Sequence, residues 1–157
     1  MILVTLGTQK QSFDRLLNYI EEANINDKII VQAGHTKFKS KKMEIFNFID
    51  YEKMNKLIED ADIVITHGGT GSIVGPLKKG KIVIACARKK EYGEHVDNHQ
   101  EQIVDVLSKE GYILSLDENN KLDNILKKID NINLKKFESN ANNFIKKLSE
   151  LVDLNLI

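Results

Sequence analysis

The stretch DIVITHGGTGSIVGPLKKGKIVIAC, Asp62–Cys86, sets a glycine-rich turn and an amphipathic segment between two apolar runs. Both runs, 62–66 and 81–86, are short and rich in β-branched residues, which is typical of strands buried on both faces of a sheet. Buried strands that alternate with a helix favour a parallel sheet with right-handed crossovers. The stretch therefore predicts an α/β fold.

The same alternation continues on both sides of this unit. Apolar periodicity predicts helices around 13–20, 54–58 and 103–107. Further strands are expected at 2–7, 28–34, 43–49 and 112–116. We therefore expect a single domain over residues 1–157, a Rossmann-like, doubly wound, mainly parallel sheet with C-terminal helices. Ligands of such sheets bind beyond the carboxyl ends of the strands.

The last third of the chain is expected to be helical, in segments 122–129 and 134–152. The second segment has one apolar stripe, and packing of this stripe on the chain's own sheet is the favoured interpretation. The stripe consists of Leu134, Phe137, Ala141, Phe144, Ile145, Leu148, Leu151 and Val152. The final DLNLI, 153–157, is either a frayed end or a surface for a partner.

Composition narrows the classes of function. The 157 residues carry a formal net charge of +0, which gives no electrostatic reason to expect a nucleic acid or an anionic membrane as the main partner. The single cysteine, Cys86, excludes a disulfide framework, and the N-terminus lacks the pattern of a signal peptide. No apolar run approaches the roughly 20 residues that a transmembrane helix needs. These features predict a cytoplasmic protein.

The glycine turn at 68–72 follows a buried strand and leads into a helix. Such a turn presents unpaired backbone N–H groups and the positive end of the helix dipole to whatever lies above the sheet, which favours an anion. Glycines allow close approach of the backbone, while Thr70 and Ser72 can cap the helix or donate hydroxyls to phosphate. A tight turn without a ligand is the alternative. A cap at Ser72 would place Pro76 near the first turn, where its missing N–H costs least.

A second polar cluster follows the strand at 81–86. Basic side chains there can neutralise a pyrophosphate, carboxylates and amides can bind sugar and ribose hydroxyls, and histidine can move a proton. The alternative is a solvated loop in which Asp97 caps the next helix. The cluster contains Arg88, Lys89, Lys90, Glu94, His95, Asp97, Asn98, His99 and Gln100.

Metal ligation is not favoured. His95 and His99 are four residues apart, but no further cysteine or carboxylate pattern completes a zinc site. The sequence DAD at 60–62 precedes a strand and so belongs to the opposite edge of the sheet. For His35 a structural role is expected, whereas for His67 a structural role and a role in the site remain open.

Three segments, in matching order over about residues 1–102, resemble the C-terminal-type domain of glycosyltransferase family 28. They are VTLGTQKQSFDRLL (4–17), ADIVITHGGTGSIVGPLKKGK (61–81) and RKKEYGEHVDNHQ (88–100). More narrowly, the chain resembles the soluble subunit of two-component bacterial exopolysaccharide and capsule glycosyltransferases. That subunit is similar to the cytosolic catalytic half of the eukaryotic two-chain UDP-N-acetylglucosamine transferase of dolichol-linked oligosaccharide synthesis.

The resemblance implies the donor-binding half of a GT-B enzyme that takes a UDP-sugar and needs no cofactor. It places the glycine turn around the diphosphate and residues 94–100 around ribose and sugar. It also implies a membrane-attached, acceptor-binding partner subunit, a lipid-linked saccharide acceptor and a location at the inner face of the membrane, while homo-oligomerisation stays open. The implied substrate-binding residues are Gly7, Thr8, His67, Gly68, Gly69, Thr70, Gly71, Ser72, Arg88, Glu94, His95, Asp97, Asn98, His99 and Gln100.

Two positions depart from the family pattern. Gly75 and Pro76 stand where a ribose-binding Glu is common, so Gln100 is the candidate for that contact, and Ala87 replaces a common proline. Inverting transfer needs a general base, for which His95 and Glu94 are candidates unless the partner supplies it. Two other hypotheses are a non-catalytic nucleotide-sugar-binding or enhancer subunit and a flavodoxin-like or other nucleotide-binding regulator.

Overall fold

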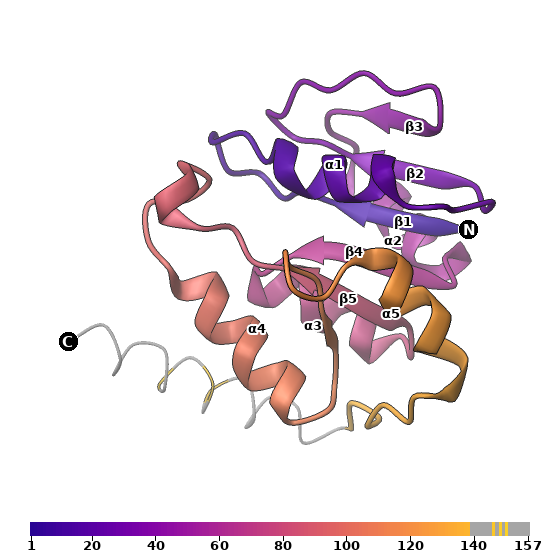
Figure 1. Ribbon diagram of the computed structural model, residues 1–157, viewed down its shortest axis with the longest axis vertical. Helices are drawn as coiled ribbons and strands as arrows, with labels where there is room; N and C mark the ends of the chain where they lie inside the picture. Colours follow the sequence, from indigo (N-terminus) through magenta and orange to yellow (C-terminus); the bar gives the residue numbers. More distant parts are fainter. Residues whose placement is uncertain (139–145, 147, 149, 151–157) are drawn as a thin grey trace.

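The computed structural model describes residues 1–138 together with residues 146, 148 and 150 (Figure 1). Six strands form one sheet in the order β3-β2-β1-β4-β5-β6, and every pair in it is parallel. The Rossmann-like α/β prediction is confirmed. The strands are β1 (Ile2–Thr5), β2 (Ile29–Gln32), β3 (Met43–Phe46), β4 (Ile63–His67), β5 (Ile82–Cys86) and β6 (Leu114–Ser115).

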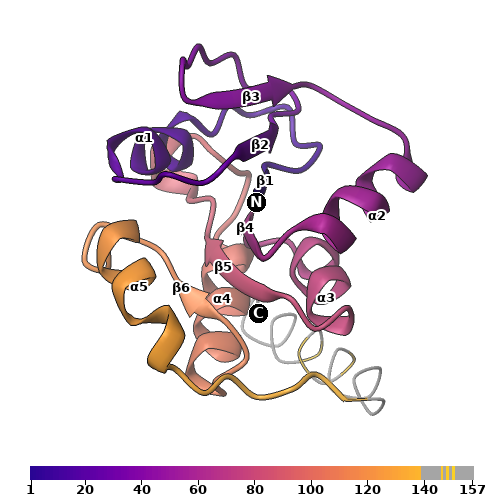
Figure 2. The ribbon, with the colours of Figure 1, turned by 90° about the vertical axis from the view of Figure 1, so that its right-hand side faces the viewer.

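Helices cover both faces of this sheet (Figure 2). On one face α1 and α5 bury Phe13, Leu17 and Ile125 against alternate residues of the strands. On the other face α2, α3 and α4 form two further apolar clusters. The helices are α1 (Asp14–Glu22), α2 (Tyr51–Asp60), α3 (Thr70–Lys78), α4 (His99–Lys109) and α5 (Leu122–Lys128), with 3₁₀ turns η1 (Lys90–Tyr92) and η2 (Ile129–Asn131).

The chain reverses its direction of sheet growth at β1, which pairs with β2 on one side and β4 on the other. Thr5 is aligned with Gln32 of β2 and with Thr66 of β4, so three polar side chains lie side by side near the carboxyl ends of these strands. A crevice forms at such a reversal because the loops that follow the two central strands lead to opposite faces. The segments after β1, β4 and β5 meet at this edge, as predicted.

Helix α3 begins earlier than expected. Its N-cap is Gly69 rather than Ser72, and the Gly69 carbonyl accepts the first helical bond from the amide of Ile73 at 3.1 Å. The Ser72 hydroxyl is engaged by the ring of His67, so it does not cap the helix. Pro76 consequently lies inside α3, and the expectation that it falls near the first turn is wrong.

The C-terminal segment agrees with expectation in part. Residues 122–128 are helical, whereas 132–138 form no regular structure, so the predicted helix does not begin at 134. Leu148 is helical and buried in the cluster of α3 and α4, which confirms packing on the chain's own domain at this position. The remaining stripe positions from Ala141 to Val152, and the DLNLI tail, lie outside the described residues. Among the described helices none has the length and apolar content to cross a membrane.

Candidate functional site

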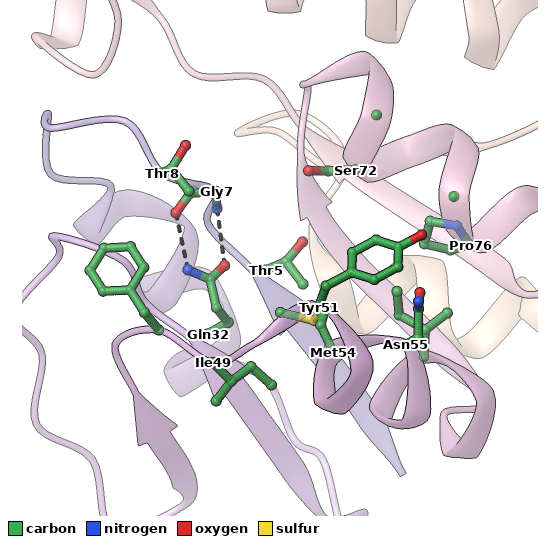
Figure 3. A pocket seen from close by; sticks show the side chains of 14 residues that line it. Thr5, Gly7, Thr8, Gln32, Ile49, Tyr51, Met54, Asn55, Ser72 and Pro76 are labelled. Atoms are coloured by element: carbon green, nitrogen blue, oxygen red, sulfur yellow. Dashed lines mark hydrogen bonds between the residues drawn. The ribbon is translucent and has the colours of Figure 1, made fainter.

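A pocket of about 500 Å³ opens at the reversal point between α2 and α3 (Figure 3). One wall is apolar and comes from the segment after β3 and from α2. The facing wall is the first part of α3, and polar side chains of β1 and β2 form the floor. The lining residues are Thr5, Gly7, Thr8, Gln32, Phe48, Ile49, Tyr51, Met54, Asn55, Ile58, Gly71, Ser72, Gly75 and Pro76.

The Gln32 side chain holds the loop that follows β1. Its Oε1 accepts a hydrogen bond from the Gly7 amide at 3.2 Å, and its Nε2 donates to the Gly7 carbonyl at 3.0 Å (Figure 3). A third bond runs from Nε2 to the Asn47 carbonyl at 3.1 Å. Gly7 has a φ of 78°, which a residue with a side chain adopts only with strain. Gly7 and the adjacent Thr8 are thereby fixed at the rim of the pocket.

The first two amides of the glycine turn are used inside the protein. The amide of Gly68 donates to Oε1 of Gln100 at 2.9 Å, and the amide of Gly69 donates to Nδ1 of His67 at 3.2 Å. The next amides, 70–72, belong to the first turn of α3, which the helix's own hydrogen bonds cannot satisfy. The donors available to an anion are therefore those at 70–72, beside the pocket, rather than those of Gly68 and Gly69.

Close packing explains two of the three glycines. A Cβ on Gly68 would lie 2.8 Å from Cβ of Gln100 and 2.9 Å from that residue's carbonyl oxygen. A Cβ on Gly69 would lie 2.4 Å from Cε1 of His67. At Gly71 a Cβ would meet nothing within 4 Å. Gly68 and Gly69 are thus required by the fold, while Gly71 leaves room on the ligand side.

We expect Gly68→Ala to lower the free energy of unfolding by about 2 kcal/mol, because the new methyl group collides with the backbone of α4. Gly71→Ala is the matched control and should raise it by up to about 1 kcal/mol, since alanine favours a helix. Urea denaturation of both variants measures the difference. Equal stability of the two variants would contradict the packing described for the turn.

Arg88 joins the loop after β1 to the loop after β5 and is only 1% exposed. Its guanidinium donates to the carbonyls of Leu6 at 2.7 Å, Gln11 at 2.7 Å and Glu94 at 2.9 Å. It also lies 4.9 Å from the centre of the Phe13 ring. Burial lowers the pKa of Arg88 to about 10, so the side chain remains a cation at neutral pH. Its position makes it a brace between loops, with a positive charge close beneath the site.

Glu94, a candidate base, is also engaged. Its two carboxylate oxygens accept hydrogen bonds from the Arg15 guanidinium at 2.9 and 3.0 Å, and one of them accepts a bond from the amide of Lys89 at 3.0 Å. The side chain is almost completely buried. Because both oxygens of this carboxylate are occupied by Arg15 and one of them also by an amide, Glu94 is not free to contact an acceptor hydroxyl, which leaves His95 as the stronger candidate of the two.

Asp97 lies between the two histidines of the loop. Its Oδ1 is 3.1 Å from Nδ1 of His95, and its Oδ2 is 3.3 Å from Nδ1 of His99. Asn98 is the N-cap of α4 without a side-chain cap bond, while Asp97 accepts from the His99 amide at 3.0 Å. Asp97 was predicted as the N-cap of this helix; it lies one residue before the N-cap, Asn98, and still accepts a hydrogen bond from the first turn. Nδ1 of His95 also accepts a hydrogen bond from the backbone amide of Asp97 at 3.3 Å.

His67 is 7% exposed and lies beneath the glycine turn. Its Nε2 is 3.0 Å from the Ser72 hydroxyl, and its Nδ1 is 3.1 Å from Nε2 of Gln100. Burial, aided by the charge of Arg88, lowers the pKa of His67 from 6.5 to about 4. For His67 the sequence left open a structural role and a role in the site. The ring is buried, as for a structural role, and it contacts Ser72, which lines the pocket.

The pKa of His67 makes stability depend on pH. Between pH 6.5 and 4 the unfolded chain binds a proton at this residue that the folded protein does not, so the free energy of unfolding falls as pH falls through this range. The gap corresponds to about 3 kcal/mol. His67→Asn should remove this part of the pH dependence in urea denaturation, whereas the control His35→Asn, at an exposed position, should keep it. A wild-type slope in His67→Asn would contradict the assignment.

The DAD sequence lies apart from the pocket, whereas His35 borders it through Phe48. Asp62 binds the N-terminal amine at 2.6 Å before β4, at the opposite edge of the sheet, as expected for the DAD sequence. The ring of His35 contacts Phe48 edge-to-face at 5.2 Å. Within the described part of the chain, no group of three histidine, cysteine or acidic side chains is placed to hold a metal.

The apolar wall of the pocket was not predicted from the sequence. Phe48 is 51% exposed and Tyr51 is 80% exposed, which is unusual for large apolar side chains. Met54 and Ile49 complete this wall. Their place directly after a strand that ends at the same edge as the glycine turn is the signal that could have identified them.

The fold and the site define a Rossmann-like domain with a ligand pocket at the reversal point of its sheet. The sequence matches the family model described as glycosyltransferase family 28 C-terminal domain over residues 1–154. The chain therefore belongs to this glycosyltransferase family, and the resemblance predicted from sequence is confirmed at that level.

Individual relatives agree with this assignment. The chain is 39% identical over 75 residues to the UDP-N-acetylglucosamine transferase subunit ALG13 of Saccharomyces cerevisiae, covering 47% of this chain and 35% of the yeast protein. The human subunit of the same name is 32% identical over 126 residues, covering 71% of this chain and 10% of that protein. This chain thus spans about a third of the yeast relative and a tenth of the human one.

Solved structures support the fold. The solution structure of ALG13 superposes with a TM-score of 0.63 at 22% identity, covering 96% of both chains. The glycosyltransferase SnogD from Streptomyces nogalater gives a TM-score of 0.52 at 17% identity, covering 73% of this chain and 30% of that one. The domain thus resembles one half of a GT-B glycosyltransferase.

Proposed function

We propose that this chain is the donor-binding subunit of an inverting, UDP-sugar-dependent glycosyltransferase. The observation that carries the proposal is the pocket itself, which sets an apolar wall opposite the N-terminus of α3. An apolar surface suits a nucleotide base, and the first amides of a helix suit a phosphate. Membership of a glycosyltransferase family and relatives named as UDP-N-acetylglucosamine transferase subunits support a uridine nucleotide as ligand.

The pocket suggests how the donor lies. The base packs against Ile49, Tyr51 and Met54, and the diphosphate lies at the amides of 70–72 and beside Thr8. The sugar extends toward the loop at 94–100. Because both polar ends of Gln100 are bonded within the protein, as are those of Gln32, we assign the ribose contact predicted for Gln100 to another polar group of the pocket, with Asn55 as the candidate.

The reaction follows from this placement. An acceptor hydroxyl oxygen bonds to the anomeric carbon as the bond from that carbon to the β-phosphate oxygen breaks, and the hydroxyl proton passes to a base. The amides of 70–72 stabilise the negative charge that develops on the departing diphosphate. His95 is the candidate base on this chain, and its Nδ1 accepts a hydrogen bond from the Asp97 amide at 3.3 Å beside the Asp97 carboxylate. The reaction is proposed to need neither a metal nor a cofactor.

The acceptor is proposed to bind on a second subunit. A GT-B enzyme closes two domains around its substrates, whereas the described residues form one such domain. We propose a membrane-attached partner, a lipid-linked saccharide acceptor and a place at the cytoplasmic face of the membrane. The relatives are named as transferase subunits, which supports a partner. Exopolysaccharide or capsule synthesis as the setting rests on the sequence resemblance alone.

A non-catalytic donor-binding or enhancer subunit is the second candidate. Two polar side chains of the loop are already bonded within the protein: Arg88 to backbone carbonyls and Glu94 to Arg15. His95 is then the base candidate that remains in the described loop, and this shortage of catalytic groups favours a non-catalytic subunit. The two functions differ in the effect of His95→Ala on the assembled complex. Catalysis by this chain predicts at least a hundredfold loss of transfer rate with unchanged UDP affinity. An unchanged rate would assign the base to the partner.

Calorimetric titration with UDP and ADP tests donor binding. We expect saturable binding of UDP with a preference over ADP, and loss of that binding in Gly75→Leu. A Cβ on Gly75 meets nothing within 4 Å and Gly75 lines the pocket, so we expect the leucine side chain to occupy the space of the ligand. Lys78→Leu is the matched control, because it adds the same side chain to an exposed position of α3 outside this pocket. Equal affinity for both nucleotides would contradict the proposal.

A further inference from the structure

The orientation of the Gln100 amide is decided by its neighbours. Its side-chain oxygen lies 2.9 Å from the amide nitrogen of Gly68 and 3.1 Å from that of Arg88, and both nitrogens can only donate. A flipped amide would set its NH₂ group against two N–H donors. The Nε2 of Gln100 must therefore face Nδ1 of His67, which lies 3.1 Å away.

This orientation determines the tautomer of His67. Nδ1 receives hydrogen bonds from Nε2 of Gln100 and from the amide of Gly69, so it carries a lone pair and no proton. In a neutral imidazole the proton is then on Nε2, which lies 3.0 Å from Oγ of Ser72. Nε2 donates, and the Ser72 oxygen accepts. The low pKa of about 4 keeps the ring in this neutral form at physiological pH.

The Ser72 hydroxyl is left with a proton to donate. No described residue other than His67 makes a side-chain hydrogen bond with it. Ser72 lines the pocket, and its oxygen points from α3 toward the side where Gly7 and Thr8 lie (Figure 3). The ring that orients it is held in place, because it fills the space that a Cβ on Gly7 or Gly69 would enter.

We propose that Gln100 and His67 are positioning residues whose fixed hydrogen-bond polarity makes the Ser72 hydroxyl a donor, so that the pocket selects ligands with an ionised phosphate oxygen there. This inference rests on the proposed function, since it names the part of the donor that Ser72 binds. It gives a reason for the burial of two polar side chains, Gln100 and His67, whose burial costs free energy unless they are hydrogen-bonded. It also assigns Gln100 a role through other residues rather than in contact with the sugar.

Gln100→Glu tests the relay with little change of shape. The glutamate still accepts from Gly68 and Arg88, but it presents an oxygen to Nδ1 of His67. In the neutral ring the proton then moves to Nδ1, Nε2 becomes an acceptor, and the Ser72 hydroxyl turns toward the ring, so affinity is measured at a pH where ¹⁵N shifts show the ring to be neutral. We expect UDP affinity to fall roughly tenfold or more, as for loss of a hydrogen bond to a charged group, while uridine affinity stays unchanged.

Two controls separate the relay from general damage. Gln102→Glu adds the same charge to the same helix at a half-buried side chain whose buried Oε1 has no partner among the described residues, and it should leave UDP affinity within about twofold because it does not reach His67. In a Ser72→Ala background Gln100→Glu should have no further effect on UDP affinity, because its target hydroxyl is absent. An additional loss in the double variant would show that Gln100 acts by another route.

A ligand-free measurement keeps the inference testable if Gln100→Glu does not fold. The ¹⁵N NMR shifts of His67 in the wild-type chain should show a protonated Nε2 and a bare Nδ1 at pH 7, and a proton on Nδ1 would overturn the relay. Ser72→Ala should lower affinity for UDP and not for uridine. If the wild-type protein binds UDP no more tightly than uridine, the phosphate site of the proposed function is refuted. If the tautomer is as expected but Ser72→Ala does not change UDP affinity, only the selection by Ser72 is refuted and the proposed function stands.

Discussion

The side chain of Gln100 is the contact on which the candidate site depends. It lies within the protein and uses its oxygen for two backbone amides, one in the turn after β4 and one in the loop after β5. An unpaired buried amide costs about 1–3 kcal/mol, so these segments are held in one arrangement. The same side chain reaches His67, and through it the start of α3. Both loops and the first turn of the helix are thereby set relative to the sheet.

Polar residues that organise the backbone differ from residues that face the pocket at this edge of the sheet. Arg88, Glu94 and Gln100 have the polarity expected of ligand-binding groups, yet their polar atoms are directed at carbonyls, amides and Arg15. The surface left for a ligand comes from the first turn of α3, the rim after β1 and the apolar side chains of 48–54. Buried charged and amide groups organise the backbone, and backbone amides with apolar side chains then face the pocket.

The sequence was sufficient for those features that depend on local pattern. Runs such as 62–66 and 81–86 are apolar because they are buried on both faces, so strand positions and the parallel sheet could be predicted. The edge that gathers the loops after β1, β4 and β5 follows from topology alone. The start of α3 was predicted wrongly because Ser72 was expected to cap the helix, whereas its hydroxyl contacts the ring of His67 and the N-cap is Gly69.

The division of roles among the polar residues was equally hidden. The sequence places Arg88 and Glu94 in one loop, but their burial depends on Leu6 and on Arg15 in other segments. The apolar wall was not predicted, because Phe48 and Tyr51 form one wall of a pocket only when the fold places α2 opposite α3. Long-range contacts, rather than residue type, decide whether a polar side chain is bonded within the protein or faces the pocket.

We propose that the start of α3 and the facing apolar wall together bind a nucleoside diphosphate. Titration of ¹⁵N-labelled protein with UDP, followed by two-dimensional NMR, tests it most directly. We expect the largest amide shifts at 70–72, Gly7 and Thr8, with smaller ones at 49–54, and little change at the opposite edge near Asp62. Shifts confined to other surfaces, or shifts at 70–72 that free uridine reproduces in full, would contradict the account.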